Sequence, residues 1–245
     1  MAGRAACALI GVLVGAAQLL CAQPTAARSA VAGSIRGHVG VGGPIPGNGL
    51  IRMGMDPKCA AMNAGARVFD RAVVAMADGS LADVFVKLDG VFPQTPVPAE
   101  PVVVDQRQCV YGPRVVGVRV GQTLRIRNDD DLLHNVHSSS GNGNTFNVGQ
   151  PKAGMVFSFT PKAEEIMVRL GCDVHRWMTS YVGVVSHPYF AVSSDDGTFV
   201  ITGVPTGTYT IRAWHERFGE LSKRVTVKAG AQSIVDIGYS QSGGQ

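Results

Sequence analysis

Short runs of alternating apolar and polar residues, separated by glycine- and proline-rich turns, limit the possible folds of this chain most strongly. Within residues 121–128, Leu124 and Ile126 alternate with arginines, and the run 164–172 alternates in the same way up to Cys172. A period of two residues predicts strands with one buried face. The 31 glycines and 13 prolines supply turns, and apolar residues at helical spacing are confined to the N-terminus. We therefore predict an all-β fold made of β-sandwiches.

The strand-like runs fall into blocks. Expected strands occupy residues 33–41, 81–90, 115–120, 121–128, 156–160, 164–172 and 181–186, with several more within 189–240. Four prolines within 92–101 predict a rigid connector and a domain border. Residues 56–65 read as a loop.

The N-terminus carries an export pattern. Arg4 precedes a small and apolar run over 5–20, and small-residue cleavage sites follow after Ala22 or Ala27. This order predicts a secretory signal peptide over residues 1–22, a periplasmic location and no membrane span after cleavage. A single membrane anchor is the alternative, but the run is short for a spanning helix of about 20 residues.

Charge and missing motifs exclude several functions. The formal net charge is +4, without a Lys/Arg run or basic residues interleaved with aromatic ones, so we expect no nucleic-acid partner. The chain has no Cys-x-x-Cys-His for haem attachment, no Cys-x-x-x-Cys for a dinuclear copper centre and no His-x-His for a multicopper cluster. It also lacks the Gly-x-Ser-x-Gly motif of hydrolases.

Three cysteines lie beyond the predicted signal peptide, namely Cys59, Cys109 and Cys172. An odd number in an oxidising compartment leaves one cysteine without a partner. We expect a disulfide between Cys59 and Cys109, with Cys172 as a metal thiolate. Two buried free thiols at Cys59 and Cys109 are the alternative.

The segment Cys172-Asp-Val-His175-Arg-Trp-Met178 places a thiolate, an imidazole and a thioether within seven residues, just after a strand. His134 ends an earlier strand-like segment, so a sandwich can bring it to the same end. Two His and one Cys with a weak axial Met are typical of an electron-transfer copper centre. We predict one copper ion, cycling between Cu(I) and Cu(II), on His134, Cys172, His175 and Met178. His137 is a rival ligand or, as we favour, a solvated loop histidine.

The segments HNVH, EEIMVRLGC and CDVHRWM resemble the cupredoxins, and the ligand loop resembles that of amicyanins most. The resemblance covers residues 102–187 and implies a Greek-key β-sandwich holding blue copper. It also implies that Asn135 ties the two ligand loops together and directs its backbone N–H toward the sulfur of Cys172. Asp173 and Arg176 depart from the family pattern, which leaves the reduction potential and the docking surface open.

Trp177 lies between two of the predicted ligands. By the same resemblance, it belongs to an apolar face on which a redox partner, such as a cytochrome or a dehydrogenase, docks. Packing over the site to exclude water is the other interpretation, and the two are compatible.

Residues 197–214, GTFVITGVPTGTYTIRAW, resemble the carboxypeptidase regulatory-like, transthyretin-like module. Such a module often opens with a strand like the one at 33–39. We therefore predict a second, smaller β-sandwich made of 31–92 and 188–240, with the cupredoxin domain 102–187 inserted into it. The alternative is that residues 31–100 extend the cupredoxin itself.

These features favour outer-sphere electron transfer and no enzymatic activity. Copper delivery or storage is the first alternative, although Met53, Met55 and Met62 form no dense tract near a histidine. The second is a structural or interaction protein with an incidental metal site. A copper enzyme would need a second metal or an open coordination position.

Overall fold

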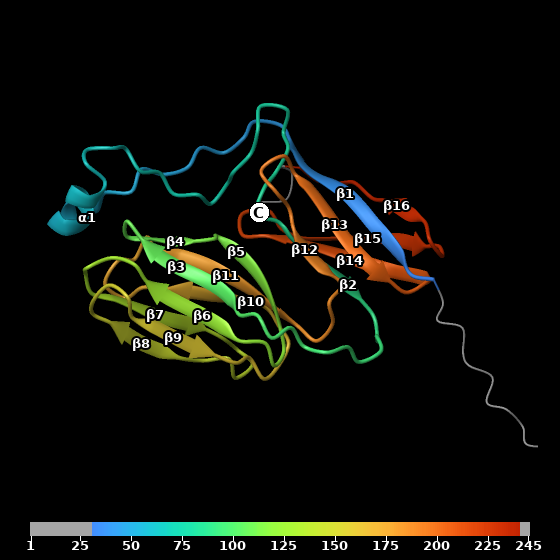
Figure 1. Ribbon diagram of the computed structural model, residues 1–245. Helices are drawn as coiled ribbons and strands as arrows, with labels where there is room; N and C mark the ends of the chain where they lie inside the picture. The colour runs from blue at the N-terminus through green and yellow to red at the C-terminus, as the bar shows by residue number, and fades with distance from the viewer. Residues whose placement is uncertain (1–30, 241–245) are drawn as a thin grey trace, which may run out of the picture.

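The computed structural model describes residues 31–240, and nearly all of its regular structure is β-strand (Figure 1). The predicted all-β fold is therefore confirmed. The signal peptide expected over residues 1–22 lies outside the described residues and stays a prediction. Within 31–240, no helix is both long enough and apolar enough to cross a membrane.

The strands form four sheets, and two short helices lie between the first two strands. The strands are β1 (Gly33–Gly42), β2 (Phe85–Asp89), β3 (Val102–Arg107), β4 (Val110–Gly112), β5 (Val115–Arg119), β6 (Leu124–Asn128), β7 (His134–Ser139), β8 (Asn147–Gln150), β9 (Val156–Phe159), β10 (Glu165–Gly171), β11 (Thr179–Val185), β12 (Phe190–Val192), β13 (Thr198–Val204), β14 (Gly207–His215), β15 (Gly219–Val227), β16 (Gln232–Ile234) and β17 (Ile237–Ser240). The helices are the 3-10 turn η1 (Met53–Met55) and α1 (Pro57–Met62).

Strands β1, β2 and β12–β17 build one sandwich, which we call the flanking sandwich. One of its sheets has the order β13-β1-β16, with β17 also paired to β1, and the other has the order β12-β2-β14-β15. Alternate residues of β1, such as Ile35 and Val39, are fully buried and meet Val86, Leu88 and Ile211 in its core. Segments from the two ends of the described chain thus share one core.

Strands β3–β11 build the inserted sandwich. Its sheets have the orders β5-β11-β10-β7-β8 and β4-β3-β6-β9. Leu124 and Ile126 of β6 point into its core, as the alternation predicted, and Val168 and Leu170 of β10 meet them there. Cys172, the residue directly after β10, is buried in the same core, so the predicted alternation leads to a thiol at one end of the sandwich.

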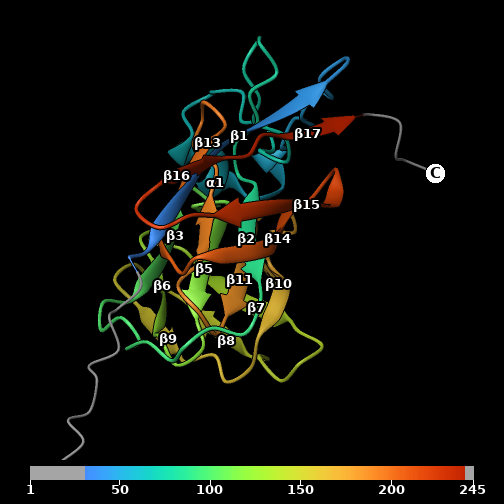
Figure 2. The same ribbon diagram turned by 90° about the vertical axis from the view of Figure 1, so that its right-hand side faces the viewer.

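Strand β5 differs from the expectation of a single buried face. Val116 and Val118 point into the inserted core, whereas Val115 packs with Phe85 of the flanking sandwich. The reason is that the β5–β11 edge lies beneath the flanking sandwich, whose strands β14 and β15 cross its direction (Figure 2). Gly183 of β11 leaves room there for the Phe85 ring.

Gly183→Ala is expected to destabilise the fold by about 1–3 kcal/mol, because its methyl group would overlap the Phe85 ring and force the two sandwiches to shift. Urea unfolding followed by circular dichroism measures the change. Gly149→Ala is the matched control, since nothing lies within 4 Å of an added methyl group there. Equal midpoints for the two variants would contradict the tight contact.

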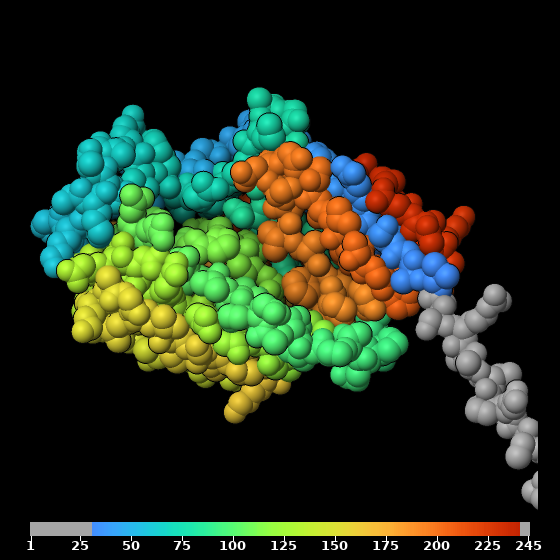
Figure 3. Space-filling view, in the orientation of Figure 1, coloured from blue at the N-terminus to red at the C-terminus, as the bar shows by residue number. Residues whose placement is uncertain are grey.

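Residues 43–80, which we call the arm, join β1 to β2 and extend across the inserted sandwich (Figures 1 and 3). Met53 and Cys59 are buried in the core of the inserted sandwich, and residues near them pack on it. The arm lies within the range 31–92 that we assigned to the flanking module by sequence. Its residues near Met53 and Cys59 nevertheless pack on the inserted sandwich.

The arm also contains helix α1, where we expected a loop. Asp56 caps the helix by accepting hydrogen bonds from the backbone N–H groups of Lys58 and Cys59. Pro57 follows at the first helical position, where its missing N–H costs nothing. This start signal is present in the sequence, but the helix has only six residues, too few for a helical period to show.

Candidate metal centre

The four predicted ligands lie at one end of the inserted sandwich. His134 is the first residue of β7, and the turn between β10 and β11 carries Cys172, His175 and Met178. Strand β7 pairs antiparallel with β10, so the start of β7 lies beside the turn that follows β10. Strand pairing thus brings together residues separated by 41 positions in the sequence.

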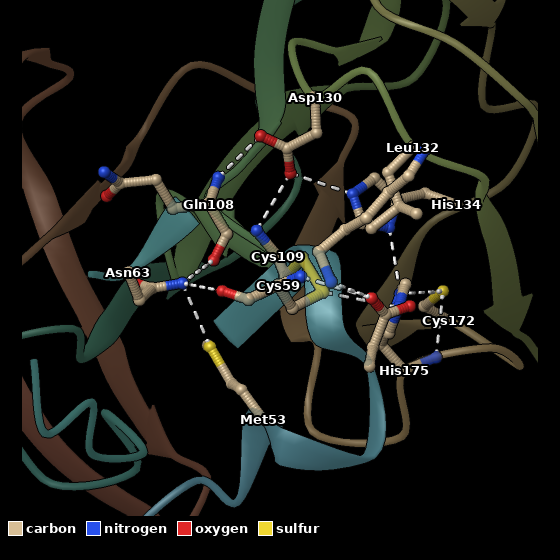
Figure 4. The surroundings of a disulfide bond; sticks show 12 residues. Met53, Cys59, Asn63, Gln108, Cys109, Asp130, Leu132, His134, Cys172 and His175 are labelled. Carbon is tan, nitrogen blue, oxygen red and sulfur yellow. Dashed lines mark hydrogen bonds and ion pairs between the residues drawn. A yellow bond between two sulfur atoms is a disulfide. The ribbon is translucent and has the colours of Figure 1, made fainter. Parts of the chain in front are cut away.

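Three donor atoms face one another in this place (Figure 4). The Nδ1 atoms of His134 and His175 are 3.0 Å apart, and the sulfur of Cys172 lies 3.8 Å from Nδ1 of His175. All three side chains are buried, and their donor atoms lie within 4.8 Å of one another. Met178 is buried in the same core as Cys172, and its backbone N–H donates to the carbonyl of His175 over 2.9 Å.

A carboxylate holds the outer nitrogen of each imidazole. Nε2 of His134 lies 2.9 Å from Oδ2 of Asp130, and Nε2 of His175 lies 3.1 Å from Oδ2 of Asp56. Since a carboxylate accepts, each pair favours a proton on Nε2, which makes Nδ1 the nitrogen that can bind a metal when the ring is neutral. Two such nitrogens beside a thiol form a donor set that a cation would satisfy, and imidazole with thiolate suits copper. The residues therefore fit the expected metal.

The charges in the site are coupled. Burial lowers the pKa of His134, but its hydrogen bonds with Asp130 and Cys172 outweigh burial and raise that pKa to about 9. Burial raises the pKa of Cys172, whereas its bonds with His134 and with nearby backbone N–H groups lower it to about 7. The protein thus favours the thiolate, which is the form of cysteine that binds metals.

Asn135 links the two ligand segments. Its backbone N–H points to the sulfur of Cys172 at 3.5 Å, the contact that the resemblance implied. Its side chain bonds Asp173 twice: Nδ2 donates to Oδ2 over 2.9 Å, and Oδ1 accepts from the backbone N–H over 2.6 Å. Asp173 also accepts from His137, whose ring is partly exposed and lies outside the three-donor group. The structure thus separates His137 from the candidate ligands.

The arm closes the site from one side. The Cys59–Cys109 disulfide is present, which confirms this pairing. The sulfur of Cys59 lies 3.5 Å from Nε2 of His175. The indole N–H of Trp177 donates to the carbonyl of Cys109 over 2.8 Å, and its ring centre lies 5.1 Å from that of His175. Trp177 therefore packs over the site, in line with the second interpretation of this residue.

Sequence reasoning missed Asp56, Asp130 and the arm that covers His175. For Asp56, the Asp-Pro pair that starts α1 was an available signal for a helix cap, but it gave no hint of a histidine contact. Asp130 lies within the run Asp129–Asp131, in which nothing distinguishes the residue that faces inward. Their roles follow from the fold alone.

No family model and no curated protein matches this chain. Among solved structures, it is similar to a purple cupredoxin from Nitrosopumilus maritimus, with 24% identity over 34% of this chain and 98% of that one, at a TM-score of 0.30. A point mutant of amicyanin in its oxidised state shows 27% identity over 34% of this chain and 81% of its own, at 0.31. The copper-containing nitrite reductase of Thermus scotoductus SA-01 shows 19% identity over 40% and 25%, at 0.33. The neighbours are thus cupredoxin-like proteins, and each covers at most two fifths of the chain.

Proposed function

We propose that this chain is a periplasmic mononuclear blue-copper protein that transfers electrons without transforming a substrate. One observation carries the proposal: the Nδ1 atoms of two buried histidines and the sulfur of Cys172 face one another, while carboxylates hold both outer nitrogens. Copper would be held by His134, Cys172 and His175, with Met178 as the weak axial ligand, and would supply one-electron chemistry. The partner would be a redox protein, such as a cytochrome or a dehydrogenase.

The chain's own residues would keep the ligands still during electron transfer. Asp130 and Asp56 fix the orientation of the two imidazoles, and Asn135 ties the segments that carry His134 and Cys172. Burial excludes water from the donor atoms. Such support reduces the rearrangement between oxidation states, which favours fast transfer.

The first test is a Cu(II) titration of the purified protein lacking residues 1–22, followed by visible absorption. We expect one equivalent to bind and an intense band near about 600 nm, the signature of thiolate-to-copper charge transfer in His₂Cys sites. Binding without this band would overturn blue copper and favour delivery or storage. Absence of binding would overturn the metal site and leave an interaction protein.

Copper binding is expected to strengthen as pH rises. In the metal-free protein the pKa of His134 is about 9 and that of Cys172 about 7. Between these values His134 keeps a proton that copper must displace, so the apparent affinity should rise by about tenfold per pH unit. Below pH 7 two protons compete, and the rise is steeper. Competition with a chelator at pH 6, 8 and 10 measures this slope, and a flat profile would contradict the coupled pair.

A further inference from the structure

A cavity of about 460 Å³ lies between the arm and the two sandwiches. The arm contributes Ile51 and Val68 to its apolar wall, and the inserted sandwich contributes Val110, Pro113 and Trp177. These residues leave an apolar space beside the candidate metal centre. The dimensions suit a small molecule with one ring.

Trp177 connects this cavity to the metal centre. Trp177 lines the cavity, and its ring centre lies 5.1 Å from that of His175. The hydrogen bond from its indole N–H to the carbonyl of Cys109 fixes the ring in this place. A molecule in the cavity is therefore separated from a candidate copper ligand by a single side chain. The direct approach to Nε2 of His175 is closed by Asp56 and Cys59.

The charges around the cavity favour a cation. Its lining includes three carboxylates and two guanidinium groups, listed here: Asp70, Asp83, Asp195, Arg71 and Arg114. Arg114 pairs with Glu216, which accepts from Nε and Nη2 at 2.6 and 2.7 Å, and its Nη1 lies 3.1 Å from Oδ1 of Asp70. With Glu216 counted, four carboxylates surround two guanidinium groups, so negative charge is in excess around the cavity.

Asp83 is the carboxylate best placed to select a ligand. It is half-buried at the junction of the arm and the flanking sandwich, and none of the described residues donates a hydrogen bond to its side chain. Arg71 and Arg114 influence it only through longer-range attraction, and burial raises its pKa. A ligand that brings its own positive charge would supply the missing partner.

We propose that this cavity binds a small aromatic cation, such as a catechol with a protonated amine, and that Trp177 relays one electron from it to the copper centre. The binding step stands on the cavity alone, whereas the relay rests on the proposed function. In the relay the bound catechol loses one electron, which converts Cu(II) to Cu(I). It also loses one phenolic proton to water and leaves as a semiquinone.

Binding is tested first on the copper-free protein by isothermal titration calorimetry. Dopamine, neutral 4-methylcatechol and anionic 3,4-dihydroxyphenylacetate share the same ring and differ in charge. We expect dopamine to bind at least about tenfold more tightly than the anion. Asp83→Asn should weaken dopamine about fivefold, as loss of one ion pair would. Asp131→Asn, an exposed carboxylate outside the cavity, should leave it unchanged. Equal affinity for the three compounds, or no binding, would overturn the site.

The relay is tested on the copper-loaded protein by stopped-flow loss of the blue band. The rate should saturate with dopamine, and Trp177→Phe should lower the saturated rate at least about tenfold while dopamine binds within about threefold of the wild-type affinity. A saturated rate that Trp177→Phe leaves unchanged would overturn the relay. A protein that binds dopamine but develops no blue band with Cu(II) would overturn the relay together with the proposed function, and the cavity site would stand.

Discussion

Cys172→Ser is expected to abolish the absorption near about 600 nm and to weaken Cu(II) binding by at least about a hundredfold. The band requires a thiolate bonded to copper, and Cys172 is the single free cysteine among the described residues. Loss of a partner that merely supports a metal ligand already costs about 10–100-fold in affinity, so loss of a ligand should cost more. Visible absorption and chelator competition give the two quantities.

His137→Ala is the matched control for this variant. His137 lies on β7 only three residues from His134, but its ring bonds Asp173 and does not belong to the group of three donor atoms. The variant should keep the band and the affinity. A band that survives in Cys172→Ser, or that disappears in His137→Ala, would contradict the assigned ligands.

Removal of the disulfide is expected to lower the free energy of unfolding by about 4 kcal/mol. Cys59 and Cys109 are separated by 50 residues, and a loop of this length restricts the unfolded chain by about that amount. The double variant Cys59→Ser with Cys109→Ser tests this by guanidinium unfolding of the copper-free protein, monitored by circular dichroism.

The same variant separates stability from metal binding. The disulfide touches His175 from outside, at Nε2, while the donor atom Nδ1 faces inward. Copper should therefore still produce the blue band in the variant. A loss of stability below about 1 kcal/mol would contradict the role of the bond as an anchor for the arm, and loss of the band would show that the anchor also shapes the site.

The sequence predicted the fold correctly in segments where the local alternation of apolar and polar residues determines which side of a strand is buried. The runs at 121–128 and 164–172 placed Ile126 and Leu170 in the core, because period two and one buried face are properties of a strand alone. The candidate ligands after β10 could be predicted from sequence equally well, since Cys172, His175 and Met178 lie within one turn.

The remaining parts depend on distant contacts that no local pattern records. Asp56 bonds His175 across 119 positions of the sequence, and residues between them carry no period that predicts this pairing. The burial of both faces of strand β5 could not be predicted for the same reason, since its second face is buried by Phe85 of the flanking sandwich. Sequence therefore predicted the donor atoms better than the groups that hold them.

The route of the chain between the two sandwiches has a consequence for the order of folding. Strands β1 and β2 pair only with strands that follow the inserted sandwich, so both lack strand partners until residues 190–240 have been made. The chain leaves and re-enters at neighbouring points, because the ring of Phe92 lies 4.5 Å from that of Tyr189. Once folded, the inserted sandwich holds the two points where the chain leaves and re-enters the flanking sandwich close together. It thereby removes most of the roughly 4 kcal/mol of loop-closure entropy that about 100 flexible residues between the two segments of the flanking sandwich would cost.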